Sequence, residues 1–369
     1  MTRLLIIADD FTGALDTGVQ LASGGIRTCV MTRLDALTED RFQAEDVLVI
    51  DAETRHLSPE DAYGIVFDIC RRAESFSVPF IYKKTDSVLR GNIGAELSAL
   101  MDGTGTQRLP FIPAFPCQGR VTRNGVHYVN GVPLAESVFG NDPFDPVDHS
   151  RVEDIIHQQT DRQVYSARPG ENMGDEEGIY VFDAVSDDDL RLTGARLAED
   201  GDLHIMAGCA GFAAGLPELL DIPRTREGGA PELSGRMLVI CGSVNPVTRG
   251  QLDCAEEGGF ARYRLTPKQK LDPDFWESPE ADTFTDDIRK ALAREPLIII
   301  DTNDEDDNLS TRRYAAANGL SLEDIRERIA WSLGRLLKDI CDDPHIDMLF
   351  ITGGDTLFKC MEALGVHEM

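Results

Sequence analysis

The sequence has no long hydrophobic run, no paired metal-ligand motif and little positive charge. None of its apolar stretches approaches the roughly 20 residues that a membrane span requires, and the run after Met1 is too short for a signal peptide. The eight cysteines form no C-x-x-C pair, and the seven histidines form no H-x-x-x-H pair. We therefore expect reduced thiols, a cytoplasmic location and no structural zinc site.

Positive charge is scarce: 36 Lys and Arg stand against 65 Asp and Glu, which gives a formal net charge of -29. Nucleic acids and anionic membrane surfaces are bound by basic faces, so we expect neither as a partner. A small anionic substrate is still compatible with this composition, because its site needs only local positive charge.

Short apolar runs alternate with amphipathic segments, which predicts an α/β fold of two doubly wound domains with mainly parallel sheets. We expect a first domain over 1–225 and a second over 235–369, with the Pro- and Gly-rich linker at Asp221–Ser234. The predicted strands of the first domain are Leu4–Ala8, Val47–Asp51, Phe80–Lys83, Leu109–Pro113, Ile179–Phe182 and His204–Ala207. Its predicted helices are Gly18–Gly24, Pro59–Ser75, Gly91–Met101, Val152–Gln159 and Asp187–Ala198.

Two adjacent carboxylates, Asp9 and Asp10, follow the first predicted strand directly, and Thr12 and Gly13 come next. In open α/β sheets, ligands bind beyond the carboxyl ends of the strands, where helix N-termini offer free N–H groups. Two carboxylates at such a place can hold the hydroxyls of a polyol, and one can act as a base. The alternative is that Asp10 or Thr12 only caps the helix.

A second polar loop follows the strand Phe80–Lys83 and carries Lys84, Asp86, Ser87 and Arg90 within seven residues. The Arg90 guanidinium can grip a carboxylate through two parallel hydrogen bonds. A carboxylate-binding arginine beside hydroxyl-accepting aspartates suits an acid sugar. A surface ion-pair cluster is the alternative.

The long Pro- and Gly-rich run 112–128 is too rich in aromatic and β-branched residues to be disordered, and we expect a structured lid or hairpin. Its Arg120, Arg123 and His127 could contact substrate or phosphate, or could be structural anchors.

The predicted strands of the second domain are Met237–Cys241, Leu297–Asp301 and Met348–Thr352. The first and the last end in turns that supply backbone N–H groups and hydroxyls at a helix start, which suits a nucleotide phosphate. These turns contain Ser243, Thr248, Gly353, Gly354, Asp355 and Thr356. Neither matches the Walker pattern G-x-x-x-x-G-K-[ST].

Together these stretches resemble the four-carbon acid sugar kinase family, which includes threonate, erythronate and 3-oxo-tetronate kinases. The resemblance rests on five segments in fixed order and spans residues 4–365. The segments are Ala8–Gly13, Lys84–Asn92, Pro113–Val126, Gly242–Thr248 and Thr352–Thr356.

The resemblance implies an N-terminal acid-sugar domain, a C-terminal nucleotide domain and an active site in the cleft between them. It implies ATP as the donor and the C4 hydroxyl as the acceptor, and Mg²⁺ would help to neutralise the phosphates. Asp9, Asp10, Asp86 and Arg90 would contact substrate, and the six turn residues of the second domain would line the nucleotide site. Thr12, Lys84 and Ser87 are the other expected substrate contacts.

Within this site, Arg90 would fix the substrate carboxylate, and either Asp10 or Asp86 would orient or deprotonate the attacking hydroxyl. These three residues are the expected catalytic set, and we expect no protein metal ligand.

Family members usually continue beyond the Gly-Gly-Asp-Thr helix, so we expect a C-terminally shortened nucleotide domain. Two alternatives to the kinase function stay open. One is a sugar-acid aldolase or isomerase, and the other is a non-catalytic sugar-acid or nucleotide sensor. The resemblance also allows a homodimer.

Overall fold

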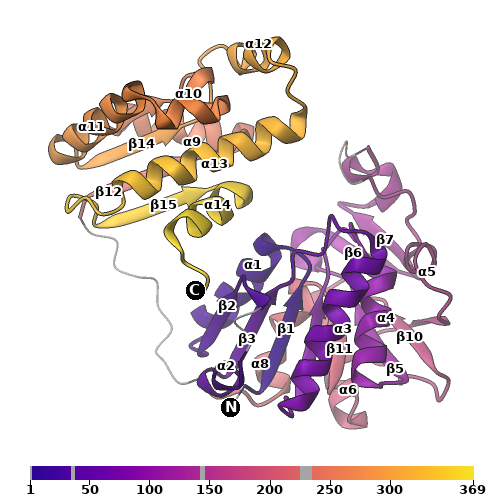
Figure 1. Cartoon of the computed structure of the whole chain (residues 1–369). Helices are drawn as coiled ribbons and strands as arrows, with labels where there is room; N and C mark the ends of the chain where they lie inside the picture. The colour runs from indigo at the N-terminus through magenta and orange to yellow at the C-terminus, as the bar shows by residue number, and fades with distance from the viewer. Residues whose placement is uncertain (1, 35–37, 142–145, 225–234) are drawn as a thin grey trace. The chain divides into compact units, whose positions relative to one another are not determined.

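The structure is a computed structural model that describes residues 2–34, 38–141, 146–224 and 235–369. The chain divides into two compact units, Met1–Ala230 with Glu368–Met369, and Pro231–His367. Figure 1 draws the described residues up to 224 from indigo to pink and residues 235–369 from orange to yellow. Most of the linker predicted at Asp221–Ser234 lies outside the described residues.

The first unit is built on an eight-stranded sheet of parallel strands in the order β2-β3-β1-β4-β11-β5-β10-β9. Its strands are β1 (Leu4–Ala8), β2 (Thr28–Met31), β3 (Val47–Asp51), β4 (Phe80–Lys84), β5 (Arg108–Ile112), β9 (Val164–Ala167), β10 (Gly178–Phe182) and β11 (Ile205–Gly208). The six predicted strands are thereby confirmed, and their bounds differ by no more than one residue at either end. The edge strands β2 and β9 were not predicted, because each is only four residues long and partly exposed.

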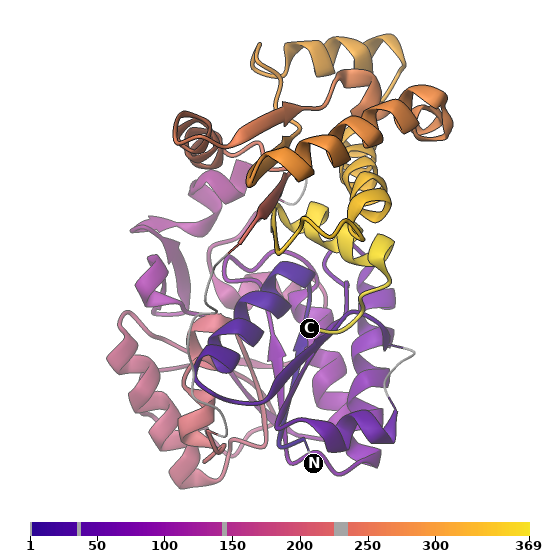
Figure 2. The same ribbon diagram turned by 90° about the vertical axis from the view of Figure 1, so that its left-hand side faces the viewer.

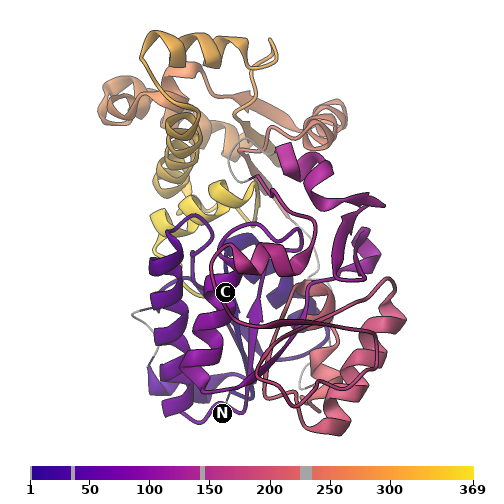
Figure 3. The ribbon, with the colours of Figure 1, turned by 90° about the vertical axis from the view of Figure 1, so that its right-hand side faces the viewer.

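Helices cover both faces of this sheet, as Figures 2 and 3 show from opposite sides. They are α1 (Phe11–Ser23), α2 (Glu39–Ala44), α3 (Pro59–Ser75), α4 (Ile93–Thr104), α5 (Val152–His157), α6 (Asp187–Asp200), α7 (Ala210–Ala213) and α8 (Leu216–Leu219). Successive side chains of a strand point to opposite faces. Leu5 and Ile7 of β1 accordingly join the core under α3 and α4, and Leu4 and Ile6 join the core under α1 and α6.

The first helix begins seven residues earlier than the predicted Gly18–Gly24. The Asp10 side chain accepts a hydrogen bond from the Gly13 N–H at 2.9 Å and caps α1 directly after β1. The predicted helix was wrong at its start because Thr12 and Gly13 are weak helix formers, and the cap compensates for them. As a result, the first turn of α1 lies close to the carboxyl end of β1.

The run 112–128 forms a hairpin, as predicted. The antiparallel strands β6 (Arg120–Arg123), β7 (Val126–Val129) and β8 (Val132–Pro133) make a small separate sheet. Asn124 and Gly125 both have positive φ, which is the backbone that a tight two-residue turn requires.

The second unit holds a four-stranded parallel sheet in the order β13-β14-β12-β15. The strands are β12 (Met237–Cys241), β13 (Ala261–Arg264), β14 (Leu297–Asp301) and β15 (Met348–Thr352), so the three predicted strands have the predicted bounds and β13 was missed. The helices are α9 (Pro246–Glu257), α10 (Pro267–Leu271), α11 (Pro279–Arg294), α12 (Leu309–Ala317), α13 (Leu322–Ile340) and α14 (Gly354–Leu364).

Both units are therefore parallel sheets flanked by helices, which confirms the predicted fold class. None of the helices in the described ranges combines the length and apolar character that crossing a membrane requires.

Candidate functional site

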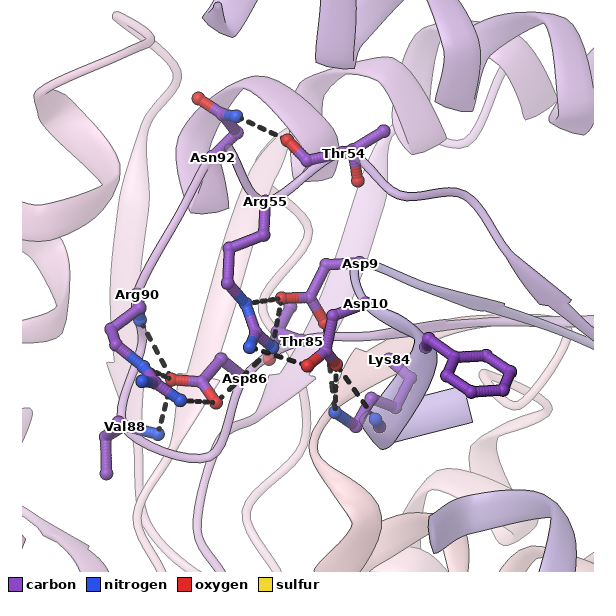
Figure 4. A network of polar contacts seen from close by, with 12 residues as sticks. Asp9, Asp10, Thr54, Arg55, Lys84, Thr85, Asp86, Val88, Arg90 and Asn92 are labelled. Carbon is purple, nitrogen blue, oxygen red and sulfur yellow. Dashed lines mark hydrogen bonds and ion pairs between the residues drawn. The ribbon is translucent and has the colours of Figure 1, made fainter. Parts of the chain in front are cut away.

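Six charged side chains meet at the carboxyl ends of the neighbouring strands β3, β1 and β4 (Figure 4). Because the three strands are parallel, the loops that follow them lie at one edge of the sheet. We call this set the Arg55 cluster; it consists of Asp9, Asp10, Arg55, Lys84, Asp86 and Arg90.

Arg55 lies at the centre of the cluster and bonds carboxylates from two loops. Its Nε donates to Asp9 Oδ2 at 2.8 Å, its Nη1 donates to Asp10 Oδ2 at 2.6 Å, and its Nη2 lies 3.5 Å from Asp86 Oδ1. Only 9% of its side chain is exposed. Arg55 was not among the predicted site residues, although its position four residues after the predicted strand Val47–Asp51 was a usable signal.

Arg90 forms a two-pronged pair with Asp86. Its Nε donates to Asp86 Oδ2 at 2.8 Å and its Nη2 donates to Asp86 Oδ1 at 3.1 Å. The backbone N–H groups of Val88 and Arg90 also point to Asp86 Oδ2, so the loop folds around this carboxylate. In this structure the fork of Arg90, predicted to grip a substrate carboxylate, is engaged by Asp86.

The ammonium group of Lys84 lies against the first turn of α1. Its Nζ is 3.8 Å from Asp9 Oδ1 and 4.0 Å from Asp10 Oδ1. A Cβ atom at Gly13 would lie 2.0 Å from this Nζ. Gly13 therefore leaves the room that the buried ammonium occupies, which is the physical reason for a glycine in this motif.

Opposite charges keep two of the carboxyl groups ionised. Burial by itself raises the pKa of Asp9, but Arg55 and Lys84 outweigh it and hold that pKa below the ordinary value. Burial acts the same way on Asp86, where the Arg90 hydrogen bonds and the Arg55 charge hold the pKa far below the usual range. Both side chains are therefore hydrogen-bond acceptors at neutral pH.

Ser87 and Thr12 lie at the margins of the cluster. Ser87 is half-buried, and Thr12 is exposed in the first turn of α1. The Ser87 carbonyl lies 3.0 Å from Nε2 of the buried His127 on β7. Since a carbonyl only accepts, Nε2 carries the proton, and Nδ1 accepts from the Thr122 hydroxyl at 3.0 Å. His127 is therefore an anchor between the hairpin and the loop of Asp86.

Of the other two hairpin arginines, Arg120 donates to Gln118 and Arg123 lies 5.3 Å over the ring of Tyr128.

In the second unit, the turns after β12, β14 and β15 converge. Ser243 Oγ and Thr248 Oγ1 are 3.4 Å apart. A Cβ atom at Gly242 would lie 1.9 Å from Thr356 Oγ1, so the first and last turns touch. Gly353 has a φ of 107°, and it caps α14, whose first turn contains Gly354, Asp355 and Thr356.

Asn303, which follows β14, was not predicted. Its Nδ2 donates to the Ser243 carbonyl at 3.0 Å and to Asp301 Oδ1 at 2.8 Å. The Asp355 side chain, unlike that of Asn303, is largely exposed. Its exposed fraction is 60%, and its Oδ2 lies 3.4 Å from Arg326 Nε.

The glycine turns fit a nucleotide phosphate in one observable respect. The first N–H groups of α14 have no helical partner, and they lie beside Gly242 and Gly353, where an added Cβ atom would meet Thr356 Oγ1.

Comparison with known proteins assigns the same two parts. Residues 4–216 match the family described as the sugar-binding N-terminal domain, and residues 238–369 match the nucleotide-binding C-terminal domain. The chain is 33% identical to the D-threonate kinase of Salmonella typhimurium, over 99% of this chain and 87% of that protein. It is 28% identical to the D-erythronate kinase of Heliobacterium modesticaldum, over 99% and 86%. For the 3-oxo-tetronate kinase of Burkholderia multivorans the identity is 27%, over 98% and 86%.

The fold is also found in solved crystal structures, among them those of two further proteins. A Haemophilus influenzae protein aligns with a TM-score of 0.74 at 20% identity, over 99% of this chain and 89% of that one, which shows the shared fold. A Bordetella bronchiseptica protein aligns with a TM-score of 0.54 at 25% identity, over 99% and 86%. That crystal holds bound citrate and a domain-swapped dimer.

A sugar-binding α/β domain joined to a nucleotide-binding α/β domain defines a phosphotransferase with an alcohol group as acceptor. The chain belongs to the four-carbon acid sugar kinase family, as the resemblance of its motifs implied.

Proposed function

We propose that this kinase transfers the γ-phosphoryl group of ATP to the C4 hydroxyl of D-threonate. The observation that carries the proposal is the Arg55 cluster, in which two guanidinium groups and a lysine ammonium face three carboxylates, and only Arg90 and Asp10 are more than a tenth exposed. An acid sugar offers one carboxylate and several hydroxyls, and the cluster has donors for the former and acceptors for the latter. The choice of D-threonate rests on the 33% identity to a D-threonate kinase.

We assign the substrate carboxylate to Arg90, with Lys84 and the margin residues Ser87 and Thr12 as further contacts. Arg90 is the more accessible of the two arginines, since 26% of its side chain is exposed against 9% for Arg55. A bound carboxylate would share or replace the hold of Arg90 on Asp86.

We assign the role of base to Asp10. Asp10 is the most accessible of the three carboxylates, at 21% exposed against 2% for Asp9 and 9% for Asp86, so a substrate hydroxyl can reach it most easily. The hydroxyl would give its proton to Asp10 as its oxygen bonds the γ-phosphorus, and ADP would leave. Asp9 and Asp86 would accept from the other hydroxyls.

We assign the nucleotide phosphates to Ser243, Thr248 and the Gly353–Thr356 turn of the second domain. The support is the first turn of α14 beside two glycines. Mg²⁺ would supply charge neutralisation of the phosphates when bound. Phosphoryl transfer depends mainly on such neutralisation and on positioning, so no covalent enzyme intermediate is required.

The proposal is tested by ADP release from Mg-ATP with D- and L-threonate, D- and L-erythronate and their 2- and 3-oxo forms. We expect the highest kcat/KM with D-threonate and a loss of at least about a hundredfold in Arg90→Ala, since a charged two-pronged contact is removed. Arg27→Ala is the matched control, because Arg27 pairs with Asp46, which precedes β3 at the opposite edge of the sheet. A higher kcat/KM with another acid would correct the substrate, and no turnover of any acid would overturn the proposal.

We also propose a cytoplasmic location and a homodimer. All eight cysteines are free thiols, as a reducing compartment would keep them. The support for a dimer is the Bordetella bronchiseptica crystal structure. Sedimentation equilibrium of the full chain at micromolar concentration tests it, and a monomer mass would contradict it.

A further inference from the structure

A fully buried ion pair lies beneath the Arg55 cluster. Lys83 Nζ on β4 is 3.0 Å from Glu96 Oε2 in the first turn of α4, and neither side chain has any exposed surface. Taking two charges out of water costs as much as their attraction returns unless further hydrogen bonds satisfy them, so such pairs are weak evidence for stability. Stability alone therefore does not explain why this ion pair is buried here.

The remaining hydrogen bonds of the pair run to the loops that carry the candidate site. Lys83 Nζ donates to the backbone carbonyl of Lys84 at 3.0 Å. Glu96 Oε1 accepts from the hydroxyl of the buried Thr54, which precedes Arg55. Each charge thus holds a residue that lies next to, or belongs to, the Arg55 cluster.

Thr54 also ties this loop to the first motif through its backbone. The N–H groups of Thr54 and Arg55 both donate to the Asp9 carbonyl, at 3.0 and 3.1 Å. Asn92 Nδ2 donates to the Thr54 carbonyl at 2.8 Å, as Figure 4 shows. Of these Thr54 contacts, the hydrogen bond that its hydroxyl donates is the one that reaches the buried ion pair. This hydrogen bond therefore connects the Glu96 carboxylate to the backbone that orients the Arg55 side chain.

We propose that Lys83, Glu96 and Thr54 are positioning residues for acid-sugar binding, which fix Arg55 and Lys84 in place without touching the substrate. The inference rests on the proposed function. It assigns these three side chains to the substrate half of the reaction, because the hydrogen bonds and the ion pair described for them lie within the sugar-binding domain.

Thr54→Val is the sharpest test, because valine keeps the shape of threonine and removes only the hydroxyl. We expect KM for the acid to rise about tenfold, as for the loss of a hydrogen bond to a charged group, with KM for ATP unchanged. Thr54→Ser keeps the hydroxyl and should restore the KM of the unaltered chain. KM is independent of how much protein is folded, so a merely structural role would lower the Tm and leave KM for the acid where it was.

Ser98→Ala is the matched control. Ser98 lies on the same helix as Glu96, and the variant loses a buried hydroxyl (7% of the residue is exposed, against 0% for Thr54) whose partner at 2.9 Å is Thr160 and not the Arg55 loop. Its Tm should change while both KM values stay. Equal KM for the acid in Thr54→Val and Ser98→Ala would overturn the inference. If Thr54→Val does not fold, Asn92→Ala removes the other side-chain anchor of this loop and must show the same selective rise.

Failure of the proposed function would look different. If the unaltered chain turns over none of the acids, the acid concentration that gives half of the maximal Tm increase replaces KM as the readout. A tenfold weaker response to D-threonate in Thr54→Val than in Ser98→Ala would still support positioning, and equal responses would overturn it.

Discussion

Arg55 Nη2 lies 2.7 Å from Asp9 Oδ2, and 9% of one side chain and 2% of the other are exposed. The pair joins the loop after β3 to the loop after β1. It holds the two loops together, because separating them would take from each buried charge one of its close partners.

Removing this guanidinium should cost both stability and activity. In Arg55→Ala, Asp9 keeps a buried charge with a weaker counter-charge, so we expect the free energy of unfolding to fall by about 3 kcal/mol. We expect kcat/KM for the acid to fall at least about a hundredfold. Arg55→Lys keeps the charge without the planar fork and should recover stability more than activity. Chemical denaturation and the ADP-release assay measure the two effects, and unchanged activity in Arg55→Ala would place the acid elsewhere.

Gly13→Ala should separate activity from stability. The new Cβ would lie 2.0 Å from Lys84 Nζ, so the ammonium must move away from Asp9 and Asp10. Alanine is a better helix former than glycine by about 1 kcal/mol, which offsets part of the strain. We expect kcat/KM to drop at least about tenfold with a Tm within a few degrees of the unaltered chain. Gly64→Ala, in α3 with open space around its Cβ position, is the control and should leave activity unchanged.

His127 should make stability depend on pH in the mildly acidic range. Burial lowers the pKa of this histidine to about 4, against 6.5 in the unfolded chain. The unfolded state therefore binds more protons between these values, and stability falls as the pH drops from about 6.5 toward 4, by up to about 1.4 kcal/mol per pH unit. Chemical denaturation across this range should show a shallower fall in His127→Gln. His204→Gln, at an exposed site, should keep the slope of the unaltered chain.

Gly242→Ala should weaken the nucleotide half of the reaction selectively. Its Cβ would lie 1.9 Å from Thr356 Oγ1 and would push the first turn of α14 away from Ser243. We expect KM for ATP to rise about tenfold or more and KM for the acid to stay. Gly250→Ala, in α9 with nothing near its Cβ position, is the control. A rise in KM for the acid instead would argue that the two turns do not hold ATP.

Sequence patterns predicted the strands that position the candidate site, because buried parallel strands are continuous apolar runs. Leu4–Ala8, Val47–Asp51 and Met237–Cys241 have the predicted bounds. The edge strand Ala261–Arg264 was missed because its side chains are only partly buried, so its apolar signal is weak. The start of α1 was missed because the Asp10 cap, and not helix propensity, decides it.

By itself, the sequence determined the fold class, the family and the two loops that carry Asp9, Asp10, Asp86 and Arg90, since each is written in a local run of residues. Only the tertiary structure decided that Arg55 lies among them and that Lys83, Glu96 and Thr54 lie beneath. Most of these contacts join the loops after β1, β3 and β4, which are neighbours in the sheet and more than 25 residues apart along the chain, and Glu96 is added from helix α4. Charges buried together must find partners across such distances, because the interior offers no water to replace them.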